Sequence, residues 1–200
     1  MGFTLENNKL VAEYWLLVLV LVAGAGAGGR DSSGPSFFGQ TAFRTDVKFR
    51  IIAVGRPPAG PMRDAIADYE SRAARYWPLE VHEVRAEPAK SRSPDEVRRL
   101  EGARLIERAT GSLVALDERG RSLSTDAFAA WMVERRQRAE DTTFAVGGAF
   151  GLDAAVRDRA LLVLSVSPWT LQHEMARLLL AEQLYRAGTI QRGEPYHKGS

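Results

Sequence analysis

The 200-residue sequence predicts an α/β fold in which a parallel-rich sheet carries helices on both faces. Three observations support this prediction. Five short apolar segments, each suited to a buried strand, follow one another along the chain. Helix patterns separate these segments, as in sheets built from alternating strands and helices. The length is that of one ordinary domain with an additional segment, and such a domain can bury a core without disulfides or metals.

The first half of this pattern contains two strands and two helices. Phe49–Val54 is an apolar run ended by a glycine and two prolines, which predicts a buried strand and its turn. Apolar residues recur at helical spacing from Met62 through Trp77 and predict an amphipathic helix. Leu79–Val84 alternates like a half-buried strand. Ser93 precedes a proline and two carboxylates, which predicts a capped helix that ends near Ala109.

The second half of the pattern predicts three more strands and three more helices. The expected strands are Leu113–Leu116, Thr143–Val146 and Leu161–Val166, with a turn at Asp117–Arg121. The expected helices are one capped by Ser124, a short one around Asp153–Arg159, and one from Thr170 to Ala187. Ligands of parallel sheets bind in the loops that follow the strands. The loops after Leu116, Val146 and Val166 therefore form the candidate site.

Two of these loops have a composition that suits ligand binding. Gly147 and Gly148 open a glycine-rich segment in which the backbone can approach a ligand closely. The segment lacks the spacing of dinucleotide and phosphate loops, so a plain turn remains an alternative. Ser167 and Thr170 bring hydroxyl groups to the start of the last helix, where either one would also serve as a simple cap.

Composition excludes several classes of function. The formal net charge is only +2 although 26% of the residues are charged, so no dense cationic stripe marks a non-specific nucleic-acid binder. The sequence has no cysteine, which rules out disulfides and thiolate zinc sites and favours a reducing cytoplasm. His173 and Glu174 approach the HExxH zinc motif, but Arg177 stands in the place of its second histidine. We therefore expect no metal site.

The first 46 residues differ from the rest and are expected to form a separate extension. Their apolar segment, 14–29, falls short of the about 20 residues that a spanning helix needs, and much of it is alanine and glycine. A signal peptide, a membrane anchor and a segment foreign to the natural protein are the three alternatives. We favour a gene-start artefact or a disordered segment, with the domain beginning at Val47, and we expect no membrane partner.

The residues from Val47 to Lys198 resemble the RlmH (YbeA) family of SPOUT-class methyltransferases. Five segments carry the resemblance in the order found in the family: KFRIIAVGR, ALDERG, FAVGGAFGL, LSVSPWTLQHEMARLLLAEQLYRA and RGEPYHK. The resemblance implies a SPOUT-type knotted α/β fold with a carboxyl-terminal trefoil knot. It also implies a homodimer that transfers a methyl group from S-adenosyl-L-methionine to N3 of a pseudouridine in large-subunit (23S) ribosomal RNA of the assembled ribosome.

The resemblance also implies site residues. The cofactor-binding positions would be Leu116, Gly147, Gly148, Val166, Ser167, Pro168, Trp169, Thr170 and Leu171. The catalytic candidates are His197, Tyr196 and Arg177. His197 is the preferred group beside the target base because a histidine exchanges protons near neutral pH.

Three other functions remain open at this point. The first is a SPOUT methyltransferase that acts on another RNA position. Such enzymes usually carry a separate RNA-binding extension, for which Lys48–Lys198 leaves no room. A non-catalytic knotted RNA- or ribosome-binding protein is the alternative from a different class. A membrane-tethered protein that uses residues 15–29 is the third.

Overall fold

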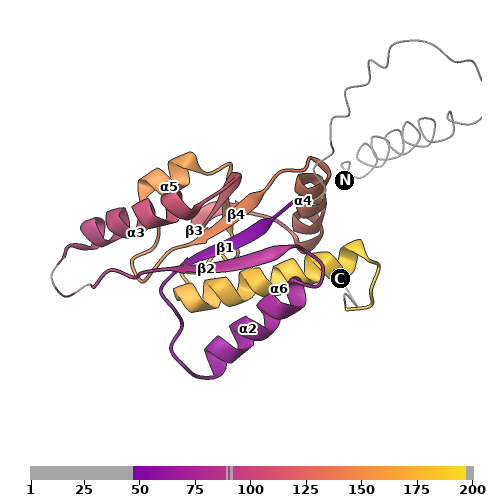
Figure 1. Cartoon of the computed structure of the whole chain (residues 1–200), viewed down its shortest axis with the longest axis horizontal. Coiled ribbons are helices and arrows are strands. Elements are labelled where there is room, and N and C mark those ends of the chain that lie inside the picture. The colour runs from indigo at the N-terminus through magenta and orange to yellow at the C-terminus, as the bar shows by residue number, and fades with distance from the viewer. Residues whose placement is uncertain (1–46, 89, 91, 197–200) are drawn as a thin grey trace, which may run out of the picture. The chain divides into compact units, whose positions relative to one another are not determined.

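The sheet has five strands in the order β2–β1–β4–β3–β5, and the computed structural model describes residues 47–88, 90 and 92–196 (Figure 1). The strands are β1 Phe49–Val54, β2 Leu79–Val84, β3 Ser112–Ser122, β4 Thr142–Val146 and β5 Leu162–Ser165. The helices are α2 Pro61–Ala73, α3 Pro94–Arg108, α4 Thr125–Gln137, α5 Ala154–Arg159 and α6 His173–Gln191. The predictions for residues 1–46 and for His197 lie outside the described residues.

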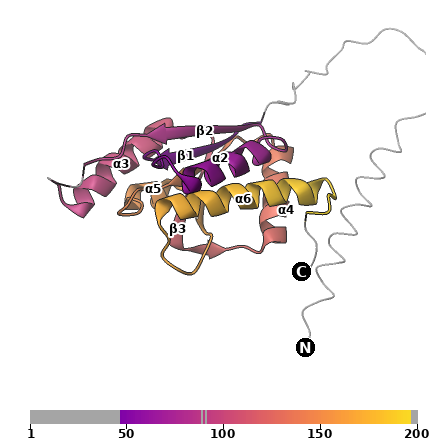
Figure 2. The same ribbon diagram turned by 90° about the horizontal axis from the view of Figure 1, so that it is seen from below.

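Every neighbouring pair of strands in this sheet is parallel, which confirms the predicted α/β class. Successive side chains of a strand point to opposite faces, so Ile51 and Ile52 of β1 belong to two different buried clusters. Residues of α2, α4 and α6 complete the cluster that contains Ile51, and residues of α3 and α5 complete the other. Helices therefore cover both faces, as Figures 1 and 2 show.

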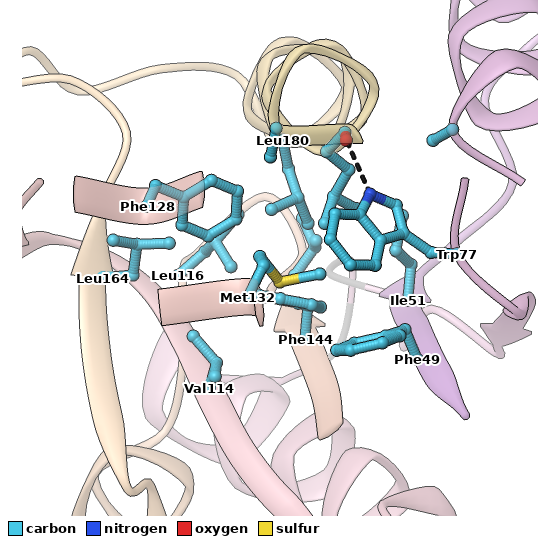
Figure 3. Close-up of a cluster of buried hydrophobic side chains, with 14 of the residues drawn as sticks. Phe49, Ile51, Trp77, Val114, Leu116, Phe128, Met132, Phe144, Leu164 and Leu180 are labelled. Carbon is cyan, nitrogen blue, oxygen red and sulfur yellow. Dashed lines mark hydrogen bonds between the residues drawn. The ribbon is translucent and has the colours of Figure 1, made fainter. Parts of the chain in front are cut away.

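The larger cluster is centred on aromatic side chains beneath α6 (Figure 3). Trp77 is only 1% exposed, and its ring meets that of Phe49 edge-on at a centroid distance of 5.4 Å. Its indole N–H donates to the backbone carbonyl of Leu184 at 2.8 Å, so the one polar atom of the ring is satisfied. This bond fixes α6 against the end of the segment that follows α2.

Side-chain caps define the starts of three helices. Ser93 and Ser124 each accept a hydrogen bond from the backbone N–H three residues further on, at 3.2 Å in both cases. Asp153 accepts the N–H two residues further on at 2.9 Å and caps the short helix α5. These bonds satisfy N–H groups that have no partner within the helix. The predicted caps at Ser93 and Ser124 are confirmed.

Strand β3 is longer than its sequence predicts. The expected turn at Asp117–Arg121 is wrong, because the strand continues to Ser122 after a register shift. Leu116 and Arg121 both pair with Leu164 of β5. The chain therefore leaves the ladder after Leu116, and the pairing resumes at Arg121. Gly120 allows this return, since a Cβ there would lie 2.6 Å from a carbonyl oxygen of β5.

The last helix starts later than expected. It begins at His173 instead of Thr170, its N-cap is Gln172, and it continues to Gln191. Ser167 does not cap it, because its hydroxyl accepts the N–H of Trp169 at 3.0 Å and closes a turn within the loop. The loop between β5 and α6 is therefore longer and more open than the sequence suggests.

Candidate functional site

A cavity of about 770 Å³ lies at the carboxyl-terminal edge of the sheet, where three segments meet. These are the loops after β4 and β5 and the segment 116–119 within β3, where the pairing with β5 is interrupted; the first turn of α6 closes one side. Its volume falls within the range of small-molecule sites. The lining residues are Arg98, Leu116, Asp117, Glu118, Arg119, Val146, Gly147, Gly148, Ala149, Phe150, Gly151, Leu152, Arg157, Leu164, Val166, Ser167, Trp169, Thr170, Leu171, Gln172, His173, Glu174 and Ala176.

The wall after β4 is a tight glycine turn. The N–H of Gly151 donates to the carbonyl of Gly148 at 3.0 Å, and Gly151 has a φ of +79° that favours glycine. A Cβ on Gly147 would lie 2.8 Å from the carbonyl carbon of Gly151, so a side chain there would push the turn open. At its glycines the turn thus brings backbone to the cavity, while Ala149 and Phe150 of the same turn also line it.

The irregular middle of β3, where its pairing with β5 is interrupted, contributes a buried, charged carboxylate. Asp117 has a side chain only 7% exposed, and it accepts bonds from the backbone N–H and the guanidinium of Arg119, both at 3.0 Å. Arg157 of α5 approaches its other oxygen at 3.3 Å. Burial alone would raise the pKa of Asp117, but these hydrogen bonds and charges hold it below its ordinary value. One wall of the cavity therefore holds a fixed negative charge whose partners are two arginines.

The first turn of α6 adds a histidine and a second carboxylate. His173 Nε2 lies 3.2 Å from Glu174 Oε1, and both side chains are partly buried where they line the cavity. A carboxylate in the first turn of a helix is favoured by the helix dipole. The cavity thus combines a glycine turn and apolar residues with three carboxylates, Asp117, Glu118 and Glu174, and three arginines, Arg98, Arg119 and Arg157, an arrangement that suits a polar ligand.

Comparison with known proteins assigns the family. A family model described as "Predicted SPOUT methyltransferase" matches residues 47–197. The chain belongs to this SPOUT methyltransferase family. A relative from Gemmatimonas aurantiaca named "Ribosomal RNA large subunit methyltransferase H" is 51% identical over 154 residues, which are 76% of this chain and 100% of the relative. Relatives of the same name from Syntrophotalea carbinolica and Anaeromyxobacter dehalogenans are 43% and 42% identical; each covers 76% of this chain, and the matches span 99% and 100% of the relatives.

A solved structure gives a more distant match to the SPOUT domain. It is the SpoU methyltransferase AviRb from Streptomyces viridochromogenes in complex with the cofactor AdoMet, with a TM-score of 0.37 and 19% sequence identity. The match covers 76% of this chain and 60% of that chain.

The SPOUT domain brings together most of the residues predicted to bind a cofactor. Eight of the nine line the cavity: Leu116, Gly147, Gly148, Val166, Ser167, Trp169, Thr170 and Leu171. The ninth, Pro168, lies in the same loop but not in the lining. Three segments far apart in the sequence thus converge as expected from the sheet, and their binding of a cofactor stays a prediction.

Arg177 lies away from the cavity of the SPOUT domain. Its side chain is 6% exposed and makes a two-pronged contact with Glu70 of α2, at 2.7 and 3.2 Å. A further guanidinium nitrogen donates to Glu83 of β2 at 3.0 Å. Burial acts to lower the pKa of Arg177, but these two carboxylates raise it above its ordinary value. In this chain Arg177 therefore joins α6 to α2 and β2, and its catalytic role stays a prediction.

Tyr196 also lies far from the cavity of its own chain. Its ring packs edge-on against Tyr185 at 4.6 Å, and its hydroxyl lies 3.5 Å from Glu182. Glu182 follows His173 by nine residues on α6, which places it roughly 14 Å along the helix from the cavity. Burial and a hydrogen bond with Tyr69 raise the pKa of Tyr196 to about 12. The phenol is therefore neutral near pH 7.

Sequence reasoning missed two acidic residues of this region. Asp117 directly follows Leu116, the end of the predicted third strand, so its place at the cavity was available from the strand pattern. Glu101 lies at four-residue spacing between Val97 and Leu105 on the buried side of α3, where a charged residue is unusual.

Among the described residues, no group of three or more His, Cys, Asp or Glu is arranged to hold a metal, and no helix is long and apolar enough to cross a membrane.

Proposed function

We propose that this SPOUT methyltransferase transfers a methyl group from S-adenosyl-L-methionine to N3 of a pseudouridine in large-subunit ribosomal RNA. The observation that carries the proposal is the convergence of three distant segments on one cavity in a chain whose close relatives are named for large-subunit ribosomal RNA methylation. Ribosomal RNA as substrate and the absence of cysteine both support a cytoplasmic location.

The cavity residues fit the proposed cofactor. The volume of about 770 Å³ suits a molecule of this size, and the glycine turn leaves space for an adenosine and offers backbone groups to bind it. The cofactor carries a positive sulfonium and a negative carboxylate, and the lining holds acidic side chains such as Glu174 as well as arginines such as Arg98. The loop residues from Val166 to Leu171 would hold the adenosine, with Leu116 on the neighbouring strand β3.

The chemistry requires alignment and the loss of one proton. The cofactor supplies an electrophilic methyl group, so this chain must hold the target nitrogen in line with it and help the imide lose its proton. A rigid cavity wall serves the first need, since small displacements lower the rate of such transfers strongly. We assign the second to the tail that contains Tyr196 and His197, where a histidine can accept a proton near neutral pH.

We propose that the tail acts on the cavity of a second copy in a homodimer. Tyr196 packs against the far half of α6 and cannot lie near the cavity of its own chain in the same arrangement. A symmetric dimer would let each tail complete the cavity of the other copy. The trefoil knot implied by the resemblance is part of the same proposal, because it would hold the three loops together as one site.

Mass spectrometry of ribosomal RNA from cells with and without the gene tests the proposed reaction. We expect the large-subunit RNA to lose one methylated pseudouridine in the deletion strain and to regain it on complementation. Unchanged modification of the large-subunit RNA would contradict the reaction. A methyl group lost from another RNA would indicate a different target, and cofactor binding without any lost methyl group would indicate a non-catalytic ribosome-binding protein.

Mixing two inactive variants tests the shared site. A His197→Ala chain has an intact cavity, whereas a Gly147→Trp chain has an intact tail and a cavity closed by a large side chain. If each tail serves the other copy, mixed dimers contain one competent site, and about a quarter of the wild-type activity returns after exchange of subunits. No recovery in a mixture shown to contain mixed dimers would rule out a shared site.

A further inference from the structure

A buried carboxylate with an unused oxygen lies behind the cavity. Glu101 of α3 is 4% exposed, and its Oε1 accepts the backbone N–H of Glu87 at 2.9 Å. Its Oε2 is buried and has no hydrogen-bond partner among residues 47–88, 90 and 92–196. Buried polar atoms of folded proteins usually have a partner, so this oxygen requires an explanation.

The unused oxygen lies directly against the cavity wall. A Cβ built on Gly148 would meet Glu101 Oε2 at 2.7 Å and the carboxyl carbon at 3.2 Å. Gly148 itself lines the cavity. The carboxylate is thus in contact with the glycine backbone that forms the wall, and only a glycine at this position leaves room for it.

The surrounding charges leave this carboxylate poorly compensated. Burial is the main influence and raises the pKa of Glu101; the hydrogen bond from the backbone N–H of Glu87 and the charges of Arg104 and His173 act to lower it, and the carboxylate of Glu87 acts to raise it. Arg104 is shared, because it also binds the carboxylate of Glu87. A buried carboxylate without a close cation is unfavourable in the free protein. A cation placed in the cavity would supply the missing charge.

We propose that Glu101 is a positioning residue that recognises the positive sulfonium of the methyl donor through the glycine wall at Gly148. This inference rests on the proposed function. Methyl transfer converts the sulfonium into a neutral thioether, so the product S-adenosylhomocysteine lacks the charge that Glu101 attracts. The residue therefore favours binding of the donor over binding of the product. Because the carboxylate is buried, its field is weakly screened.

Calorimetric titration with S-adenosylmethionine and with S-adenosylhomocysteine measures this preference. The two ligands differ by the methyl group and its charge, so the ratio of their dissociation constants reports on the sulfonium. Glu101→Gln keeps the shape of the side chain and an oxygen that accepts the Glu87 N–H. We expect this variant to lower the preference for the donor about 10-fold, as the loss of one nearby charge would.

Two further variants separate a charge effect from a structural one. Glu101→Asp keeps the charge, and we expect it to keep most of the preference. Glu80→Gln removes a carboxylate on the edge strand β2, outside the cavity lining, and we expect it to leave both affinities unchanged. Thermal unfolding of each variant verifies that it is folded.

The outcomes distinguish this inference from the proposed function. If the wild-type protein binds both ligands and Glu101→Gln weakens them equally or not at all, Glu101 has no role in sensing charge and the inference fails alone. If the wild-type protein binds neither ligand, the proposed function fails and the inference fails with it.

Discussion

Replacing Arg177 by methionine is expected to destabilise the domain strongly. Methionine keeps much of the side-chain volume but removes the guanidinium that bridges Glu70 and Glu83. The carboxylate of Glu70 is 12% exposed and would lose a two-pronged partner within its low-dielectric surroundings. Breaking a buried ion pair by removing one partner costs about 3–5 kcal/mol.

The geometry places the expected loss at the lower end of that range. Glu83 is 33% exposed, and Arg56 lies 3.9 Å away, so water and a second cation compensate part of its charge. We therefore expect the free energy of unfolding to fall by about 3 kcal/mol. A domain with ordinary stability of about 5–15 kcal/mol remains folded after such a loss.

Urea unfolding at one fixed protomer concentration measures this change, because an oligomer's stability depends on concentration. The double variant Arg177→Met, Glu70→Leu removes the pair as a whole, and we expect it to recover to within about 1 kcal/mol of the wild type. A loss below about 1 kcal/mol for Arg177→Met alone would refute the reasoning from burial. If folded Arg177→Met instead loses methyl transfer far beyond its unfolded fraction, the catalytic role implied by the resemblance is supported.

Two other predictions follow from single contacts. Gly148→Ala would place a Cβ 2.7 Å from Glu101 Oε2 and 3.0 Å from Val54, so we expect a loss of about 1–3 kcal/mol in urea unfolding; adding Glu101→Ala should restore part of it, and full stability of the single variant would contradict the packing. Hydrogen bonds from Lys48 and Arg50 lower the pKa of Glu80 to about 2. Because the folded state prefers the ionised form, the advantage of the wild type over Glu80→Gln is present above pH 4.5 and lost as the pH falls toward 2, and an advantage that is independent of pH would contradict this assignment.

The strands next to strong turn signals were predictable from the sequence. β1 and β2 have the bounds expected from their patterns, since a glycine and two prolines end the first and a proline precedes the second. The convergence of the three loops also follows from the sequence, because parallel strands place their carboxyl ends at one edge.

The course of β3 and the start of α6 depended on tertiary contacts. Asp117–Arg121 has the polar composition of a turn, yet pairing with β5 draws the chain back into the sheet. Ser167 has the identity of a helix cap, but its hydroxyl is already used inside the loop. Local sequence does not encode either outcome, because both require a partner that is distant in sequence or a competing local bond.

Charged residues buried on helices were the hardest to interpret. The resemblance implied a catalytic role for Arg177, and the structure buries this residue against two carboxylates from other elements. Glu101 occupies an apolar stripe, where helical spacing indicates burial but does not reveal a partner. In both cases the informative signal is a charge placed where periodicity predicts an apolar side chain.

Two buried contacts attach the two halves of α6 to the rest of the domain. The first turn of this helix lines the cavity, and its far half carries the packing of Tyr196. Because α6 has 19 residues, its ends are roughly 28 Å apart. Arg177 lies one turn from the cavity end and ties the helix to α2 and β2, while the Trp77 bond to Leu184 ties the far half. A rotation or sliding of α6 would therefore move the cavity wall and the packing position of Tyr196 together.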